Sequence, residues 1–338
     1  MTDILNAFVL LCNYIILPSL TYGSQLALGA LGITLIYGVL RFSNLGHGET
    51  MSFGTTITIL ITWLFQSINF SVYPMPTALI ALPFSIAVTV TIVLLTDRLI
   101  YRHYRKENAD SLVFMIASIG VMFILNGIIR FIIGPSDRRF DDGERFLMTA
   151  REFKAWSGLD EGLAIKSTQC ITIITAVASM IIFFLFLKKT RLGKSMRAFA
   201  DNDELSLLSG INPSQVVRLT WVFSATLAVV AGTLYGLDKG FKPFVFLQLL
   251  LPLFSAAILG GLGSPIGAVV GAFIIAFSEI AVTFAYKKFL FYLMPRDWEI
   301  DGMFQFLPTD YKFAVSFMIL VLVLLVRPTG IFSGTKSE

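Results

Sequence analysis

The residues that could do chemistry are few in this chain. Its two histidines, His47 and His103, lie far apart and show no metal-ligand spacing, and no serine or cysteine can be paired with a base. The tripeptide GKS at 193–195 resembles the end of a phosphate-binding loop. Lys188 stands where that loop needs its first glycine, so a phosphate cradle cannot form. The sequence predicts no catalytic residue, no metal ligands and no nucleotide site.

His47 lies in a polar, glycine-rich break between two apolar runs, reading RFSNLGHGE over 41–49. Irregular backbone at membrane depth is tolerated where protein covers it or where it lines a water-filled pathway. Gly46 and Gly48 supply backbone freedom, and Asn44 and His47 supply polar side chains. We therefore predict that Asn44, His47 and Gly48 line a polar pathway. A plain surface turn is the alternative interpretation.

One acid, Glu279, lies inside an apolar run that reads FIIAFSEIAV. A charge at the bilayer centre costs about 2.5–3.5 kcal/mol on insertion scales. Such a residue faces the interior of the helix bundle or a water-filled cavity. We treat Glu279 as a second pathway candidate, with pairing to a neighbouring group as an equal alternative.

A long basic-then-acidic segment reads KKTRLGKSMRAFADNDELSLLSGINP over 188–213. Few helix breakers occur over 191–208, which predicts a helix that ends at Gly210 and Asn212-Pro213. Its bases precede its acids, an order that the helix dipole does not favour. The pattern indicates a segment that docks on another protein. A charged, solvated loop is the alternative.

The elements that carry these residues are apolar. Of 338 residues, 56% are hydrophobic and 14% charged, against roughly 25% charged in soluble domains. The net charge of +4 gives no nucleic-acid footprint. We predict an all-α, polytopic transmembrane bundle of about 8–10 spans in a single domain, 1–338. The short segment 247–262 admits a broken or re-entrant helix. Ten apolar segments support this fold, at 4–20, 22–40, 50–66, 76–97, 112–133, 167–187, 215–236, 247–262, 266–285 and 310–326.

Charge asymmetry predicts the sidedness of the loops. Clusters of lysine and arginine over 97–110 and 188–213 place both stretches in the cytoplasm, whereas the nearly balanced loop 134–166 lies outside. This arrangement predicts that both termini are cytoplasmic, although it leaves Lys287 and Lys288 outside. The N-terminus lacks a basic region, so we expect the first apolar run to remain as an anchor.

Small residues recur at the four-residue spacing of close helix contacts. We expect five glycines to pack helices together, Gly232, Gly236, Gly263, Gly267 and Gly271. Cys12 and Cys170 each lie in an apolar run, where a lone cysteine fills space.

Five motifs, in order, resemble the permeases of branched-chain amino acid ABC importers, the LivH subunit family. They read LGALGITLIYGVLRFSNLGHGE (28–49), TRLGKSMRAFADNDELSLLSGIN (190–212), FSATLAVVAGTLYG (223–236), FSAAILGGLGSPIGAVVGA (254–272) and LLVRPTGIF (324–332). The resemblance covers nearly the whole chain. It implies a multi-pass protein of the bacterial inner membrane that works with a homologous second permease, two cytoplasmic ATPase subunits and a periplasmic solute-binding protein. ATP and Mg²⁺ would be used by the ATPase subunits, with no cofactor bound by this chain.

The resemblance also assigns roles to particular residues. Asn44, His47 and Gly48 match the family's signature near the pathway, while Gly46 and the pair Thr55 and Thr56 depart from it. Six positions match the cytoplasmic coupling segment, Gly193, Arg197, Ala200, Asp201, Glu204 and Gly210.

The substrate class stays open at this point. Branched-chain or related amino acids are implied, and urea or short amides are alternatives within the same architecture. An ion-coupled secondary transporter would need a relay of intramembrane acids, for which Glu279 is the reasonable candidate. A membrane-embedded enzyme would need a nucleophile–base pair or metal ligands, and the sequence offers neither.

Overall fold

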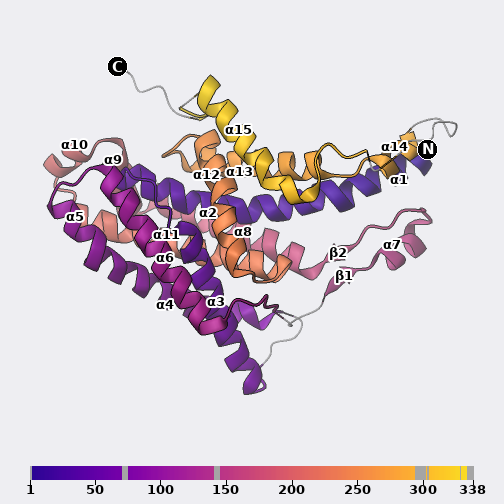
Figure 1. Cartoon of the computed structure of the whole chain (residues 1–338), viewed down its shortest axis with the longest axis horizontal. Helices are drawn as coiled ribbons and strands as arrows, with labels where there is room; N and C mark the ends of the chain where they lie inside the picture. The colour runs from indigo at the N-terminus through magenta and orange to yellow at the C-terminus, as the bar shows by residue number, and fades with distance from the viewer. Residues whose placement is uncertain are drawn as a thin grey trace.

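The computed structural model describes residues 2–70, 75–140, 145–293, 302, 304–327 and 329–332. Among these residues, eight helical segments are long and apolar enough to cross a membrane (Figure 1). The chain forms α1 (Thr2–Leu11), α2 (Leu17–Leu40), α3 (His47–Ser67), α4 (Thr77–Thr96), α5 (Arg102–Lys106), α6 (Ser111–Ile133), β1 (Phe146–Met148), α7 (Ala150–Ser157), β2 (Ile165–Lys166), α8 (Ser167–Lys189), α9 (Arg191–Asp201), α10 (Asp203–Leu208), α11 (Pro213–Lys239), α12 (Pro243–Gly260), α13 (Pro265–Thr283), α14 (Lys287–Leu293) and α15 (Lys312–Val326). Short π-helical turns span Cys12–Ile16 and Asp97–Tyr101, and a 3₁₀ turn spans Thr309–Tyr311.

The first two predicted spans are a single helix, so the expected break near residue 21 is wrong. The segment Thr2–Leu40 runs for 39 residues, about 58 Å at 1.5 Å per residue. Pro18 lacks a backbone N–H and so cannot make the usual helical hydrogen bond. The π-helical turn Cys12–Ile16 before it accommodates the proline without ending the helix. The Thr21 hydroxyl donates to the Leu17 carbonyl at 2.8 Å, which keeps the next turn closed.

The helix α3 has the length of a span but a polar first half. It runs for 21 residues and buries a row of hydroxyls, Ser52, Thr55, Thr56, Thr58 and Thr62. Most of these donate back to the carbonyl four residues earlier, and Thr58 also meets the Thr233 hydroxyl of α11 at 3.0 Å. Internal satisfaction of these groups lets a polar helix face lie inside an apolar bundle.

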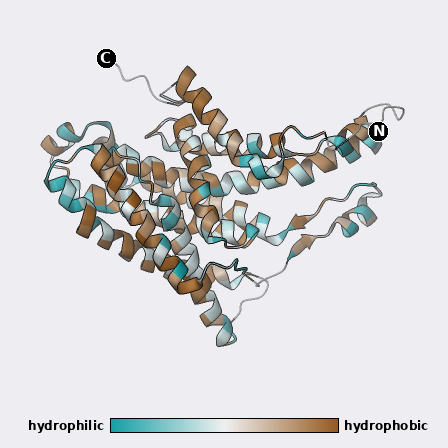
Figure 2. Ribbon diagram, viewed as in Figure 1, coloured by the Kyte–Doolittle hydropathy of each residue, from teal (hydrophilic) through white to brown (hydrophobic). Residues whose placement is uncertain are grey.

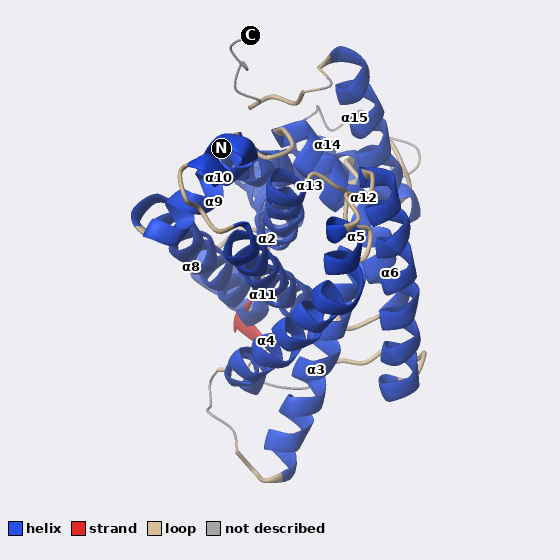
Figure 3. Ribbon diagram, turned by 90° about the vertical axis from the view of Figure 1, so that its left-hand side faces the viewer, coloured by secondary structure: helices blue, strands red, loops and turns tan. Residues whose placement is uncertain are grey.

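The centre of the bundle is α2, which packs against α13 and α11 (Figures 1 and 3). Many apolar side chains of α6, α8 and α15 are exposed, as expected for lipid contact. Figure 2 shows the hydrophobic colour along most of α6 and α15. The short segment expected over 247–262 is one continuous helix, α12. It contains Pro252 and is 18 residues long, so it is neither broken nor re-entrant in this structure.

Close glycine contacts join the helices at two places. A Cβ atom on Gly267 of α13 would lie 2.1 Å from the Gly260 carbonyl oxygen of α12, and one on Gly271 would lie 2.2 Å from the Ala256 oxygen. On α11, a Cβ on Gly232 would lie 2.6 Å from the Met51 oxygen of α3. Backbone meets backbone at these contacts, so no side chain fits between the helices.

The other two glycines of the predicted set differ from these. A Cβ atom on Gly236 would lie 3.0 Å from side-chain atoms of Thr55 and Phe140, which is a looser contact. Gly263 lies in a loop and not within a helix, yet it packs against one, since a Cβ on Gly38 of α2 would lie 3.6 Å from the Gly263 Cα atom. It occupies the turn between α12 and α13 with φ of +90°, a conformation that favours glycine.

The two predicted cytoplasmic stretches lie at the same end of the bundle. The Ser111 hydroxyl, next to the 97–110 stretch, donates to the Arg41 carbonyl at 3.0 Å, and the Arg41 guanidinium donates to the Ala200 carbonyl of α9. Residues 329–332, the last that the structure describes, lie at this end too, because the Ile331 amide donates to the Leu259 carbonyl. We call it the inner end.

The N-terminus lies at the opposite end, so the prediction that both termini share the cytoplasmic side is wrong. Asn6 of α1 contacts the Asp160 carboxylate at 3.4 Å, and its side-chain oxygen accepts the Glu161 amide hydrogen at 3.2 Å. Both partners belong to the loop 134–166. The cause is the merged first helix, which crosses once where two crossings were expected. We call this end, which carries the short hairpin β1–β2 and α7, the outer end.

Lys288, which argued against the predicted sidedness, has a partner at the outer end. Its ammonium lies 2.7 Å from the Glu161 carboxylate, and the Tyr292 hydroxyl donates to the same carboxylate at 2.8 Å. Burial and this carboxylate raise the pKa of Tyr292 to about 12. The three residues tie α14 to the loop. The loop acids Asp141, Asp142 and Glu144 lie outside the described residues.

Candidate functional site

The polar break between α2 and α3 is buried, which contradicts the interpretation as a surface turn. Asn44 and His47 are 5% and 1% exposed. The Asn44 side-chain oxygen accepts the Gly46 amide hydrogen at 3.1 Å, and the Leu45 amide donates to the Ser118 hydroxyl of α6 at 3.1 Å. The break is therefore an ordered segment held between helices at the start of α3.

His47 lies against the middle of α2. Its Nδ1 atom is 3.5 Å from the Ser224 hydroxyl of α11, which in turn donates to the Gly32 carbonyl at 3.1 Å. A Cβ on Gly32 would lie 2.5 Å from the His47 ring, so the missing side chain makes room for the imidazole. Gly48 has a similar role for α12, since its Cβ would lie 2.6 Å from the Phe246 oxygen.

The structure adds Glu49, which sequence reasoning passed over as a site residue. It is 1% exposed, and its Oε1 atom accepts a hydrogen bond from the Asn126 amide of α6 at 2.8 Å. Arg130, one turn further along α6, lies over the Phe244 ring at 4.0 Å. Asn126 is a lone amide in the apolar segment 112–133, and that isolation was the available signal.

Four aromatic rings, one of them Phe42 of the break itself, pack together in an aromatic cluster toward the inner end. Phe42 packs on Tyr101 and Phe114 with ring centroids 5.4 and 5.2 Å apart, and Tyr101 stacks on Trp221 at 5.0 Å. Asn44 borders a cavity of only about 20 Å³ beside Tyr101 and Trp221. The break therefore packs tightly against this aromatic cluster.

The predicted helix over 191–208 is two helices, because Asn202 breaks it. Asn202 leaves the helical conformation at φ −152°, and its side-chain oxygen accepts the Leu205 amide hydrogen at 2.9 Å, which begins α10. Thr190 caps α9 in the same way, with its hydroxyl accepting from Gly193 at 3.0 Å. The pair α9–α10 lies at the inner end, outside the packed spans (Figure 1).

The six matched positions of this segment do different things. Gly193 packs on the end of α8, where its Cβ would lie 2.3 Å from the Phe186 oxygen, and Gly210 adopts φ of +80° in the turn before α11. Ala200 accepts the hydrogen bond from Arg41. The other three side chains are exposed, Arg197, Asp201 and Glu204.

Glu279 lies far from the break, toward the outer end. It is 1% exposed and accepts a hydrogen bond from the Ser316 hydroxyl of α15. It borders a cavity of about 570 Å³ between α2, α11, α13 and the start of α15. The structure therefore does not bring Glu279 together with Asn44, His47 and Gly48.

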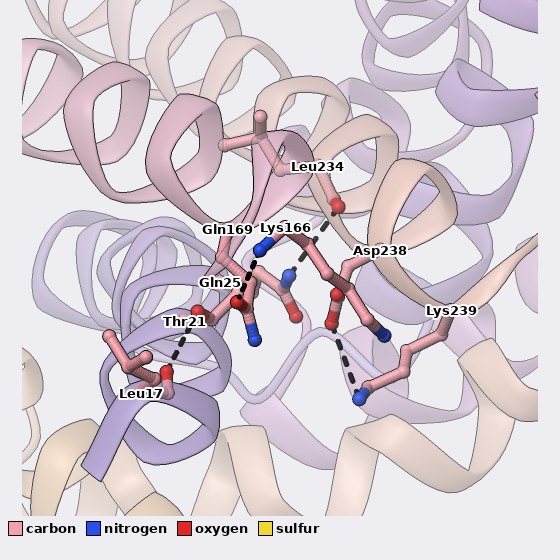
Figure 4. Close-up of polar contacts among 8 residues, drawn as sticks. All are labelled: Leu17, Thr21, Gln25, Lys166, Gln169, Leu234, Asp238 and Lys239. Atoms are coloured by element: carbon pink, nitrogen blue, oxygen red, sulfur yellow. Dashed lines mark hydrogen bonds and ion pairs between the residues drawn. The ribbon is translucent and has the colours of Figure 1, made fainter. Parts of the chain in front are cut away.

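A second buried polar cluster lies beside this cavity. Figure 4 shows Gln25 of α2, Gln169 of α8 and Asp238 of α11 gathered from three helices. The Gln25 amide donates to the Leu234 carbonyl at 3.4 Å. The Asp238 side chain is 3% exposed and lies 3.3 Å from the Lys239 ammonium. In the sequence, these residues could have been recognised as candidates because each is a polar residue within or next to an apolar segment.

Metal ligands do not gather in the part of the chain that the structure describes. No group of three or more histidine, cysteine, aspartate or glutamate side chains could hold an ion there. Cys12 and Cys170 are free and half-buried.

Comparison with known proteins identifies the family. Residues 15–324 match the family described as branched-chain amino acid transport system / permease component. The chain is 30% identical over 333 residues to the high-affinity branched-chain amino acid transport system permease protein LivH of Salmonella typhimurium, covering 94% of each chain. It is also 30% identical to BraD of Pseudomonas aeruginosa, covering 94% of this chain and 95% of that one.

A solved structure of a metal-chelate type ABC transporter in an inward-facing conformation aligns with a TM-score of 0.48 at 13% identity, covering 94% of this chain and 88% of that one. The eight apolar helices and the permease relatives make this chain a multi-pass protein of the bacterial inner membrane. The match over 15–324 and the relatives at 30% identity show that the chain belongs to the branched-chain amino acid transport system permease family.

Proposed function

We propose that this chain is one permease of a pair in an ATP-driven importer for branched-chain amino acids. Two ATPase subunits bind at the inner end and use ATP and Mg²⁺, and a periplasmic binding protein delivers substrate at the outer end. The chain itself carries no catalytic activity in this proposal. The names of the relatives support the substrate class.

The observation that carries the proposal is the exposed helix pair α9–α10 at the inner end. Leu208 of α10 is 86% exposed, and Leu205 and Leu207 are 62% and 51% exposed. Leucines on a water-facing helix indicate a protein partner, because leaving them in water costs free energy that a contact would recover. Arg41 links this pair directly to α2.

The polar break supports the same proposal. Conformational change at the inner end would reach Asn44 through the two residues that separate it from Arg41, which are Phe42 of the aromatic cluster and Ser43. Movement of α9 against Arg41 is therefore placed to open or close the bundle below the break.

The test is co-purification of this chain with the ATPase subunits of its transporter. We expect deletion of 190–212 to abolish association while membrane insertion persists, and Leu208→Glu to weaken it without removing the helices. Leu147→Glu, an exposed leucine at the outer end, is the matched control. Retention of the ATPases by the deletion variant would refute the docking assignment. Uptake driven by a proton gradient without ATP would instead favour an ion-coupled transporter.

A further inference from the structure

The cavity of about 570 Å³ at the outer end is large enough for a small ligand. Small-molecule sites occupy about 300–1,000 Å³ and combine apolar walls with a few placed polar groups. Its wall comes from the N-terminal helix, the ends of α11 and α13, α14 and the start of α15. It lies at the outer end, because Lys288 on its wall pairs with Glu161 of the loop 134–166.

A buried acid borders this cavity. One oxygen of Glu279 accepts the Ser316 hydroxyl, whereas Oε2 accepts no hydrogen bond of ordinary geometry among the described residues. The Tyr22 hydroxyl is a second, less well-aligned donor to this carboxylate. A carboxylate that is 1% exposed and has one oxygen without such a bond is poised to accept a hydrogen bond from a cation.

Lys312 on the same wall lacks a direct ion pair among the described residues, although it interacts electrostatically with Glu279 and lies over the Phe313 ring at 4.6 Å. Three lysines line the cavity, and two have carboxylate partners, since Lys239 pairs with Asp238 and Lys288 with Glu161. Figure 4 shows Lys239 turned onto Asp238. Lys312 makes no ion pair within 4.0 Å in the described part of the chain, and its ammonium lies 5.7 Å from the Tyr22 ring centroid.

Apolar side chains also line this cavity. They come from the N-terminal helix and from the end of α13, and they are Leu10, Pro18, Ile280 and Phe284. The cavity therefore offers a carboxyl group that accepts hydrogen bonds, a lysine and an aliphatic surface together.

We propose that this cavity binds a free zwitterionic α-amino acid with an aliphatic side chain, with its ammonium on Glu279 and its carboxylate on Lys312. The inference rests on the proposed function and deepens it, because it assigns the permease its own substrate site. A phosphatidylethanolamine headgroup carries the same two charges, and the experiment separates the two ligands.

The experiment measures binding of radiolabelled L-leucine to the assembled transporter in phosphatidylglycerol nanodiscs, without ATP or binding protein. We expect saturable binding. Removing one charge of the ligand tests the zwitterion, so 4-methylpentanoate and 3-methylbutylamine should compete at least roughly ten-fold more weakly than leucine.

Variants test the two residues. Lys312→Met and Glu279→Gln should each weaken leucine binding by at least roughly ten-fold. The matched controls are Lys242→Met and Glu152→Gln, an exposed lysine and an exposed acid at the outer end beyond this cavity. Because Glu279 also holds α15 through Ser316, Lys312→Met carries the test if Glu279→Gln does not assemble.

A second readout is independent of affinity. In a background with Cys12→Ser and Cys170→Ser, leucine should slow maleimide labelling of Ile280→Cys. Equal binding by Lys312→Met, equal competition by 4-methylpentanoate, or phosphatidylethanolamine retained by the wild type and lost from Lys312→Met would each overturn the amino-acid site.

Failure of the proposed function gives a different result. If the wild-type transporter with its binding protein and ATP imports no branched-chain amino acid, the function is wrong. If import is normal and unchanged by Lys312→Met, the function stands and the cavity assignment is wrong.

Discussion

Arg41 ends α2 in a left-handed backbone conformation and donates a guanidinium hydrogen bond to the Ala200 carbonyl of α9. This bond joins the 39-residue helical segment Thr2–Leu40 to the exposed helix pair at the inner end. If α9 carries force from an ATPase, Arg41 transmits it directly to the start of the polar break.

Replacement of Arg41 by alanine should therefore uncouple hydrolysis from transport. We expect ATPase activity of the assembled transporter to persist while import per ATP falls by roughly 2–30-fold, the range of a coupling change of about 0.5–2 kcal/mol. Arg102→Ala, an exposed arginine at the same end, is the control. Parallel assays of ATP hydrolysis and substrate uptake test this prediction. An unchanged ratio of uptake to hydrolysis in Arg41→Ala would exclude coupling through Arg41.

The α12–α13 contact should be intolerant of a single added methyl group. Gly267→Ala puts a Cβ 2.1 Å from the Gly260 carbonyl oxygen, so the helices must separate, at a cost of about 1–3 kcal/mol. Gly127→Ala on α6 meets nothing within 4 Å and serves as the control. Thermal unfolding of the detergent-solubilised chain should show a lower melting temperature only for Gly267→Ala.

Removal of the Asn126 side-chain amide on α6 should lower the stability of the folded protein, because Glu49 beside the break is buried. Asn126→Ala leaves Glu49 without its hydrogen-bond donor, and an unsatisfied buried group costs about 1–3 kcal/mol. Glu49→Gln keeps an acceptor for Asn126 and should cost less. Chemical denaturation of both variants measures their free energies of unfolding. Equal decreases in the two variants would mean that the Asn126–Glu49 hydrogen bond contributes little.

A pair of substitutions should reveal that Gly32 makes room for His47. Gly32→Ala alone pushes a Cβ to 2.5 Å from the imidazole and should lower both stability and transport. In the double variant Gly32→Ala with His47→Ala the clash is gone. We expect the two stability losses to be less than additive in a double-mutant cycle, whereas additive losses would show that the two residues act separately.

Labelling should place the two ends of the bundle on opposite sides of the membrane. In a cysteine-free background, Asp3→Cys should react with an impermeant maleimide added outside intact cells, because α1 lies at the outer end. Asn202→Cys should react only after the cells are permeabilised. Protection of Asp3→Cys in intact cells would restore the arrangement with both termini inside.

The sequence alone determined the class of the protein. Runs of about 20 apolar residues dictate spans whatever their neighbours are, because lipid leaves backbone groups no partner outside a helix. The order of the motifs identified the family. Asn44, His47 and Glu279 were recognisable as candidates because a polar side chain within an apolar span costs free energy unless it has a partner or lines a pathway.

The tertiary structure decided which of those residues share a site. Asn44 and His47 lie together with Glu49 and Asn126, which are 77 positions apart, whereas Glu279 lies at the outer cavity with Lys312. Sequence periodicity reports which face of a helix is apolar but not which helix covers it. The continuity of Thr2–Leu40 was hidden for a related reason, since a π-helical turn takes up Pro18 through backbone geometry that composition does not encode. Because this segment crosses the bundle once and not twice, the N-terminus lies at the outer end and not at the inner end.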